Sequence, residues 1–251
     1  MDVSTVAAYL DRELRIADFE DSSHNGLQVA NSGRLKKVCC GVDASLDFFE
    51  LAAERGADMA ICHHGISWGD SLARISGLNY RRLSTLLKYD VALYACHLPL
   101  DAHPVLGNNA QICRALGLKR LKPFGMYHGK EIGFEGVLSR PKRFTTFLNH
   151  VTECIGPPLH AWDFGRKMVE RVAVVSGGAA GEIAEAGDKD IDVYISGEQT
   201  LAAYNLAREY GINAIFAGHY ATERFGVIAV GERLKKRFGL EVEFIDTGIT
   251  V

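Results

Sequence analysis

The sequence predicts an α/β protein made of two related halves, each with a mixed, largely parallel sheet flanked by helices. Three observations predict this class. Short apolar runs alternate with amphipathic stretches, glycines end several of those stretches, and the plan of the first half recurs in the second. The 251 residues, 47% hydrophobic and 24% charged, suit one large globular domain or two small ones.

In the first half, strands and helices alternate in a regular order. The apolar runs have strand length, and the stretches between them space apolar residues at helical intervals. Strands are expected at residues 35–43, 57–64 and 91–98, and helices at 45–56, 80–90 and 108–118. Because a helix separates each strand from the next, neighbouring strands are expected to run parallel.

The second half repeats this order. Residues 170–198 align on residues 36–64 without a gap, and residues 213–223 align on residues 91–101. The identities are few, but both alignments extend over many residues. We therefore infer two related α/β halves.

The junction between the halves is expected near residues 121–130, which carry Pro123 and Gly125. The first half then covers residues 1–124 and the second half residues 125–251, with the C-terminal segment free to pack with the first half. Open α/β sheets bind ligands at the carboxyl ends of their strands, so the functional site is expected in the cleft between the halves.

Charge and hydropathy narrow the class of protein. The net charge is −3 and no basic stripe interrupts the sequence, so nucleic acid is not expected as the main ligand. No stretch approaches the ~18 apolar residues of a membrane span, and the charged N-terminus does not resemble a signal peptide. A cytoplasmic protein without membrane contact is expected.

The six cysteines form no C-x-x-C pair, and several lie inside apolar runs. They are expected to be reduced and structural, because a buried thiol behaves as a small hydrophobe. Cys62 and Cys96 each precede a histidine, so a role as ligand or nucleophile is the alternative for these two.

The stretch "ADMAICHHG" ends an apolar strand with two adjacent histidines, His63 and His64. Neighbouring side chains on an extended strand point to opposite faces, so the two rings can approach one site only where the chain bends. Gly65 follows directly and allows such a bend. Two imidazoles at a strand end are therefore candidate metal ligands.

Two further strands end in a histidine followed four residues later by a carboxylate. The pairs are His97 with Asp101 and His219 with Glu223. The four-residue spacing brings both groups to one side if the segment is helical. We expect a helix after His219, whereas the two prolines of "HLPLDAHP" favour a rigid loop after His97.

Together these strand ends offer four imidazoles and two carboxylates. That set exceeds the needs of one zinc ion and suits two divalent ions about 3.5–4 Å apart, with water as the nucleophile between them. Nitrogen and oxygen ligands without thiolate favour zinc, iron, manganese or cobalt. The remaining histidines are expected to be structural: His24, His103, His128, His150 and His160.

Two features of the second half remain open. "SGGAAGEI" at 176–183 is either a tight strand–helix turn or an anion-binding loop, although it lacks the full dinucleotide and P-loop patterns. Glu198 aligns with His64 of the first half. It is either an acid/base facing the same cleft or a solvated carboxylate at a strand end.

Six motifs together resemble the Nif-three-like dinuclear metal centre family, also described as GTP cyclohydrolase I type 2 homologues. They are "HNGLQV" (24–29), "GVDAS" (41–45), "ICHHGISW" (61–68), "HLPLDAHPVLGNN" (97–109), "DVYISGE" (192–198) and "GHYATERFG" (218–226). They span nearly the whole chain in the family's order. The chain resembles the short form of the family, without a domain inserted between the halves.

The resemblance implies metal ligands at His63, His64, Asp101, His219 and Glu223. By analogy Glu223 bridges two divalent ions, one completed by His64 and Asp101 and the other by His63 and His219. His97 lies in the same motif, and its role stays open: it is expected to support the ligands or face substrate, and a role as a ligand is the alternative. The resemblance also implies self-association into a toroidal hexamer.

We therefore predict a protein that binds two divalent ions (zinc, iron or manganese) and hydrolyses a small molecule through a metal-bridged water. His97 and Glu198 are the candidates for proton transfer. The family name suggests GTP, but the cysteine–histidine zinc set expected of a purine-ring cyclohydrolase is missing. The alternative is a ring-forming metal-binding scaffold, or a regulatory or nucleic-acid-binding protein, without catalysis.

Overall fold

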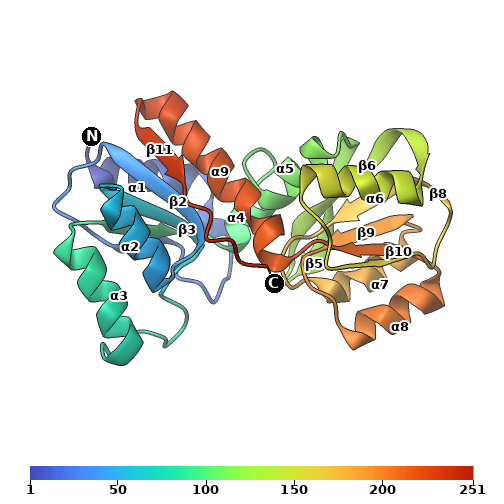
Figure 1. Cartoon of the computed structure of the whole chain (residues 1–251), viewed down its shortest axis with the longest axis horizontal. Helices are drawn as coiled ribbons and strands as arrows, with labels where there is room; N and C mark the ends of the chain where they lie inside the picture. The colour runs from blue at the N-terminus through green and yellow to red at the C-terminus, as the bar shows by residue number, and fades with distance from the viewer. Residues whose placement is uncertain (251) are drawn as a thin grey trace. The chain divides into compact units, whose positions relative to one another are not determined.

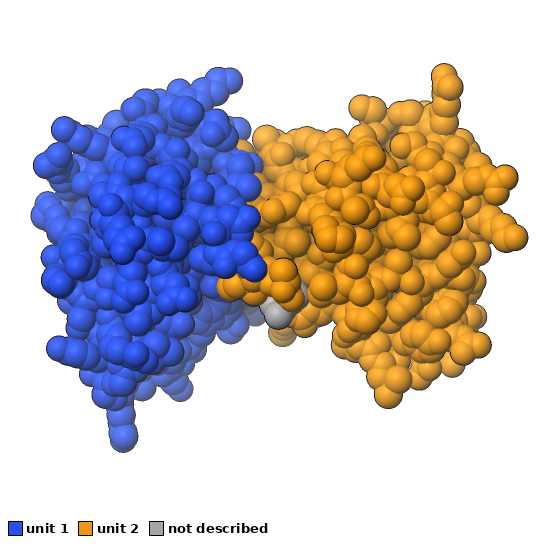
Figure 2. Space-filling view, in the orientation of Figure 1, with its two compact units in different colours: residues 1–100, 226–248 blue, residues 101–225, 249–251 orange. Residues whose placement is uncertain are grey.

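A computed structural model describes residues 1–250 and divides the chain into two compact units (Figures 1 and 2). Unit 1 contains residues 1–100 and 226–248. Unit 2 contains residues 101–225 and the chain end from Ile249. Each unit has its own sheet and its own core, so each is an α/β structure, as predicted.

The sheet of unit 1 has five strands in the order β1-β4-β3-β2-β11. Neighbouring strands run parallel, except that β1 is antiparallel to β4. The strands are β1 (Gly26–Val29), β2 (Lys37–Asp43), β3 (Met59–His64), β4 (Ala92–Ala95) and β11 (Glu241–Phe244). The parallel centre explains why β2, β3 and β4 read as continuous apolar runs, because such strands are buried on both faces.

The helices of unit 1 follow the expected alternation. They are α1 (Val3–Glu13), α2 (Leu46–Glu54) and α3 (Gly77–Lys88), with a short 3-10 turn η1 (Ile16–Asp18). Ser45 caps α2, because its side chain accepts a hydrogen bond from the amide of Phe48. Phe48 and Phe49 are fully buried and anchor α2 in the core.

The sheet of unit 2 has six strands in the order β5-β6-β8-β9-β10-β7. Its centre, β8-β9-β10, is parallel, and the outer pairs are antiparallel. The strands are β5 (Lys119–Tyr127), β6 (Lys130–Arg143), β7 (His160–Trp162), β8 (Met168–Val174), β9 (Val193–Ser196) and β10 (Asn213–Phe216). Three successive parallel strands thus recur in both units, as the alignment of the halves predicts.

The helices of unit 2 cover this sheet. They are α5 (Asn108–Ala115), α6 (Phe144–Cys154), α7 (Ile183–Asp188) and α8 (Leu201–Tyr210), with a 3-10 turn η2 (Ala180–Glu182). Phe147 and Val151 of α6 and Ile112 of α5 are fully buried in the core. Burial of these apolar side chains is the main stabilising contribution.

Two helices each contain one boundary between the units. These are α4 (Leu98–Ala102) and α9 (His219–Phe238). The longest described helix is α9, and its last turn carries Lys235, Lys236 and Arg237. Within residues 1–250, no helix combines the length and the apolar character needed to cross a lipid bilayer.

The observed boundaries differ from the expected junction near residue 124. Residues 101–124 belong to unit 2, because α5 and the start of β5 pack into its core. Pro123 and Gly125 lie inside β5, the edge strand of the sheet, where a proline need not donate a ladder hydrogen bond. Proline and glycine therefore mark a sheet edge here, not a linker.

The segment after His97 also differs from expectation. The sequence predicts a rigid loop, but Leu98–Ala102 form the short helix α4. Pro99 lies in the first turn of this helix, where its missing N–H costs no hydrogen bond and its fixed φ suits the helix. The helix expected after His219 is present as α9.

Candidate metal centre

Three imidazoles gather at one end of the sheet of unit 1. His63 and His64 end β3, and His97 follows β4, its neighbour in the sheet. Each ring offers a nitrogen, and these nitrogens lie within 4.8 Å of one another. Strand-end placement therefore brings together three of the histidines singled out in the sequence.

The two adjacent histidines share this site although they are neighbours on a strand. Their ring centroids are 4.6 Å apart, with the planes tilted by 50°. Gly65 is needed here for space. A Cβ at this position would collide with the side chains of Gln28 and Ala95, whereas Gly65 has no positive φ. The Gln28 amide oxygen accepts the N–H of Ile66 (2.8 Å), which fixes the chain just after the histidines.

Each of the three imidazoles is held at Nδ1. His63 Nδ1 donates to the carbonyl of Cys96 (2.9 Å), and His64 Nδ1 donates to Asp43 Oδ1 (2.8 Å). His97 Nδ1 donates to Asp21, at 3.0 and 3.1 Å from its two carboxylate oxygens. Carbonyl and carboxylate oxygens only accept hydrogen bonds, so each ring carries a proton on Nδ1, and Nε2 is the nitrogen that could bind a metal ion.

Asp21 is almost entirely buried, with a side chain 2% exposed. Burial alone would raise its pKa. The hydrogen bond and charge of His97 and the hydrogen bonds from Asn25 and Ser23 outweigh burial and lower the pKa to about 2. Asp21 is therefore ionised at neutral pH and holds the His97 imidazole in one tautomer.

Trp68 forms a wall beside these rings. Its indole packs edge-on against His97 with centroids 4.9 Å apart, and it lies 5.9 Å from the ring of His64. The indole N–H donates to the carbonyl of Gly65 (2.7 Å), which fixes the ring. This matches the packing role typical of a half-buried tryptophan with a satisfied N–H.

Unit 2 presents the remaining candidates, Asp101, His219 and Glu223. Glu223 Oε1 is 3.0 Å from His219 Nε2, one helical turn away on α9. Asp101 and Glu223 each offer a carboxylate oxygen, and these oxygens lie within 4.8 Å of each other. Both carboxylates are buried, 5% and 3% exposed. Two carboxylates so close in a buried setting favour a cation between them.

Glu198 contacts the candidate ligand His219. Its Oε1 is 2.5 Å from His219 Nδ1, so it holds this imidazole as Asp43 and Asp21 hold theirs. Burial tends to lower the pKa of His219. The hydrogen bonds and charges of Glu223 and Glu198 outweigh burial and raise that pKa to about 9. Without a metal ion, the imidazole is thus protonated at neutral pH and lies between two carboxylates.

Neutral hydrogen-bond donors hold Asp101. Asn108 Nδ2 donates to Asp101 Oδ1 (2.9 Å), and the hydroxyl of Ser176 donates to the same oxygen (3.0 Å). Asn108 is fully buried and begins α5. Two donors on one oxygen fix the orientation of the Asp101 carboxylate, as expected for a carboxylate that acts as a metal ligand.

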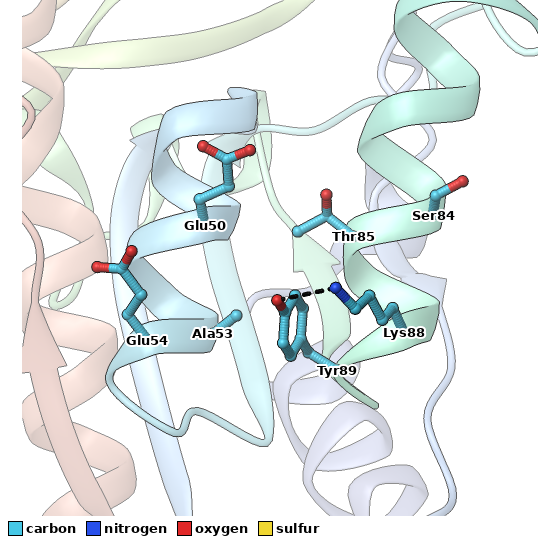
Figure 3. Close-up of a pocket in the computed structure, with 7 residues that line it drawn as sticks. All are labelled: Glu50, Ala53, Glu54, Ser84, Thr85, Lys88 and Tyr89. Carbon is cyan, nitrogen blue, oxygen red and sulfur yellow. Dashed lines mark hydrogen bonds between the residues drawn. The ribbon is translucent and has the colours of Figure 1, made fainter.

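The other sequence candidates do not join this centre. Cys62 and Cys96 are buried, and burial raises the pKa of the Cys62 thiol well above its usual range, so it is unreactive. A hollow of about 370 Å³ lies between α2 and α3. Figure 3 shows the residues that line it, among which Lys88 donates to the Tyr89 hydroxyl (3.2 Å). Its lining contains none of the residues named as candidate ligands or their partners.

Sequence reasoning missed the residues that orient the ligands. Asp21, Asp43, Asn108 and Ser176 received no role, although three of them lie inside motifs noted in the sequence. A search for amides near ligand-type residues would have included Asn108, seven residues after Asp101. Asp43 is 21 residues from His64 and meets it through the pairing of β2 with β3. Asp21 and Ser176 have no such signal, because each is more than 70 residues from its partner in sequence.

The donor set fits divalent metal ions. Imidazole nitrogens and carboxylate oxygens are the ligands that zinc, iron and manganese take, and each candidate imidazole has its Nδ1 bonded to an acceptor, as metal-ligating histidines do. Unit 1 supplies three imidazoles, and unit 2 supplies one imidazole and two carboxylates.

Comparison with known proteins places this chain in a family. The family model described as Duf34/NIF3 (NGG1p interacting factor 3) matches residues 1–249. A protein of Deinococcus radiodurans named GTP cyclohydrolase 1 type 2 homolog is 42% identical over 238 residues, covering 95% of this chain and 90% of its own.

Two solved structures share the fold over the full chain. The protein ybgI, of unknown function, is 35% identical with a TM-score of 0.93, and the match covers 100% of both chains. The protein TTHA1606 of Thermus thermophilus is 38% identical with a TM-score of 0.91, covering 99% of this chain and 100% of its own. The similarity thus extends over both units.

Proposed function

The chain belongs to the Duf34/NIF3 family, and from that premise we propose that it binds two divalent metal ions and acts as a metal-dependent hydrolase. The proposed ligands are His63, His64, Asp101, His219 and Glu223. One observation carries the proposal. All four strand-end imidazoles have Nδ1 bonded to an acceptor, which is the arrangement that metal-ligating histidines need.

The ions would supply Lewis-acid polarisation of substrate and a water of lowered pKa. The chain's own residues would set the geometry. Glu223 and Asp101 would each hold an ion through a carboxylate oxygen, and Asn108 and Ser176 would keep the Asp101 carboxylate in one orientation. Binding would displace the proton that His219 holds between Glu198 and Glu223.

His97 is the proposed proton-transfer residue. Asp21 fixes its tautomer, and one nitrogen of its ring lies within 4.8 Å of a ring nitrogen of His63 and of His64. A general base needs this combination of fixed orientation and proximity. Glu198 is proposed to position His219, because its carboxylate is already engaged with that ring.

The substrate is proposed from the name that relatives carry. GTP is the first compound to test, because relatives about 40% identical are named as GTP cyclohydrolase 1 type 2 homologues. Self-association, into the ring that the family resemblance implies, is proposed alongside. The GTP substrate and the ring assembly are thus two parts of one proposal, that of a small-molecule hydrolase.

Metal content per chain is the direct test. Protein purified without chelator or nickel resin should contain close to two transition-metal ions per chain by inductively coupled plasma mass spectrometry. GTP consumption would then be followed by chromatography with that metal present. Near-zero metal that persists after zinc, iron and manganese are offered back would overturn the proposal.

Substitution of Glu223 separates a hydrolase from a scaffold in which the metal is structural. Glu223→Gln should lose metal and activity and keep the oligomeric mass, because only one ligand oxygen changes. Glu232→Gln is the matched control, since Glu232 lies exposed on the same helix. A Glu223→Gln protein that keeps two ions would contradict the ligand assignment, and one that loses its assembly would favour a structural role.

A further inference from the structure

The glycine-rich stretch "SGGAAG" remains unexplained by the proposed function. It follows β8, where the sequence leaves open an anion-binding loop or a tight turn. The structure gives its first two residues, Ser176 and Gly177, a different environment, with candidate ligands of unit 2 around them. We call these two residues the glycine turn.

Gly177 lies directly against two candidate ligands. A Cβ built on it would collide with Glu223 Oε1 and would lie 3.1 Å from His219 Nε2. Its φ is +67°, in the left-handed region that favours glycine. Both space and backbone conformation therefore exclude a side chain at this position.

The backbone of Gly177 is tied to the elements that carry the ligands. Its N–H donates to the hydroxyl of Thr222 (3.1 Å), next to Glu223 in α9. Its carbonyl accepts the N–H groups of Gly197 (3.0 Å) and Glu198 (3.1 Å), and Glu198 in turn holds His219 Nδ1. One residue thus touches both candidate ligands of α9 and fixes the carboxylate that orients His219.

Ser176 connects the same turn to the third candidate ligand. Its hydroxyl donates to Asp101 Oδ1 (3.0 Å), and its N–H donates to the buried side chain of Asn109 (2.7 Å). The glycine turn therefore contacts Asp101, His219 and Glu223, directly or through one hydrogen-bond partner. It lies between elements far apart in sequence that supply these residues.

We propose that the glycine turn is the positioning element for the unit 2 ligands. In this assignment Gly177 allows Glu223 and His219 to approach the backbone, and Ser176 fixes the orientation of the Asp101 carboxylate by donating to its Oδ1. The turn acts through these side chains and does not bind an anion. As a statement about metal ligands, the inference rests on the proposed function.

Neighbouring glycines provide a matched pair of variants. Gly177→Ala introduces the collision. Gly178→Ala does not, because a Cβ there would meet Glu198 Oε2 at 3.8 Å and His219 Cε1 at 3.9 Å, which are ordinary contacts, and Gly178 has no positive φ. Ser176→Ala removes one donor to Asp101 without adding atoms, so it tests the same element if Gly177→Ala fails to fold.

Metal binding by titration with Co²⁺ is the first measurement, with circular dichroism as the check on folding. Gly177→Ala and Ser176→Ala should each weaken binding about 10–100-fold, the usual effect of losing a residue that orients a ligand. The Co²⁺ absorption spectrum should also change, because the coordination geometry shifts. Gly178→Ala should match the wild type in both readouts.

Nitrogen-15 NMR of the histidine side chains in metal-free protein is the second measurement. Gly177→Ala should shift the His219 ring signals, and Gly178→Ala should leave them in place. This readout needs no metal, so it tests the positioning of His219 separately from the proposed metal binding. If the wild type binds no Co²⁺, the proposed function fails, and the NMR result alone decides whether the turn positions His219.

Wild-type Co²⁺ binding by a folded Gly177→Ala protein would overturn the inference. So would unchanged His219 signals in that variant. Equal losses in Gly177→Ala and Gly178→Ala would also contradict it, because the structure predicts a collision at only one of the two positions. Phosphate binding that Gly177→Ala abolishes while Co²⁺ binding stays intact would favour an anion loop instead.

Discussion

Single hydrogen bonds to Nδ1 determine which ring nitrogen each candidate imidazole offers. In unit 1, a carbonyl and two carboxylates fix three rings, and in unit 2 Glu198 fixes the fourth. A neutral ring with its proton on Nδ1 needs no change of tautomer when an ion binds Nε2. Preorganisation of this kind is thus a property of individual residues outside the ligand set.

At the residue scale, Asp21 gives the clearest prediction of how the free energy of unfolding depends on pH. Its pKa is about 2 in the folded protein against an ordinary value of 3.8. A lowered pKa stabilises the fold above the unfolded value, and this stabilisation is lost as the pH falls through the folded value. Asp21→Asn should therefore lower the free energy of unfolding by about 2 kcal/mol at pH 6.

Urea unfolding between pH 6 and pH 2 measures this effect. The difference between wild type and Asp21→Asn should shrink as the pH falls from about 4 towards about 2. Asp70→Asn, at an exposed position, should show no such pH-dependent difference. A difference that stays constant to pH 2 would mean that Asp21 contributes by packing and not by its charge.

The partners of the ligands also show what sequence alone could not predict. His63, His64, His97 and His219 were found because each ends an apolar strand, and strand ends are visible as a change of composition. Asp21 and Ser176 are 76 and 75 residues from the groups they hold, and such distant pairs leave no periodicity in the sequence. The candidate ligands could therefore be selected from the sequence, whereas the residues that orient them could not.

At the scale of elements, the helices of unit 1 begin in two different ways. Ser45 caps α2 through a side-chain hydrogen bond from the amide of Phe48 (3.1 Å). Ser76 occupies the same position before α3, but its side chain makes no capping bond. Ser45 and Ser76 can therefore be compared directly, because both are N-cap residues of helices in unit 1.

Ser45→Ala should destabilise the protein by about 1 kcal/mol, the usual cost of a lost capping hydrogen bond. Ser76→Ala should be close to neutral, because no capping bond is lost. Guanidinium unfolding of the two variants measures both values. Equal destabilisation would contradict the capping assignment, since both substitutions remove the same atom.

Element order was largely predictable, and element grouping was not. Alternating apolar runs and amphipathic stretches located α2, β3, α3 and β4 to within a few residues. The boundary was misplaced because Pro123 and Gly125 are typical of linkers and also of edge strands. Which sheet receives α5 depends on packing between side chains far apart in sequence.

At the scale of the whole molecule, metal binding and stability should be coupled. An ion that binds only the folded chain stabilises it by mass action, by about 2.7 kcal/mol at a free concentration one hundred times Kd. Chelation should therefore lower Tm, and restoring zinc or manganese should raise it again. Differential scanning calorimetry measures the change.

Glu223→Gln should show a much smaller rise of Tm with metal than the wild type, and Glu232→Gln should respond like the wild type. An equal response in both variants would place the stabilising ion at a different site. Because the two units have separate cores, calorimetry also reports whether they unfold in one transition or in two.

The parallel pairing of β11 with β2 has a consequence for how the chain acquires its structure during synthesis. Unit 2 is nearly contiguous in sequence, because residues 101–225 make up almost all of it. Unit 1 is not, because Glu241–Phe244 must pair with β2, beginning at Lys37. The edge of β2 thus leaves the ribosome more than two hundred residues before its partner, at about 5–20 residues per second. During that interval the backbone N–H and C=O groups on this edge of β2 are unpaired and can pair with another chain. This edge is therefore the segment at which we expect a chaperone to bind the nascent chain.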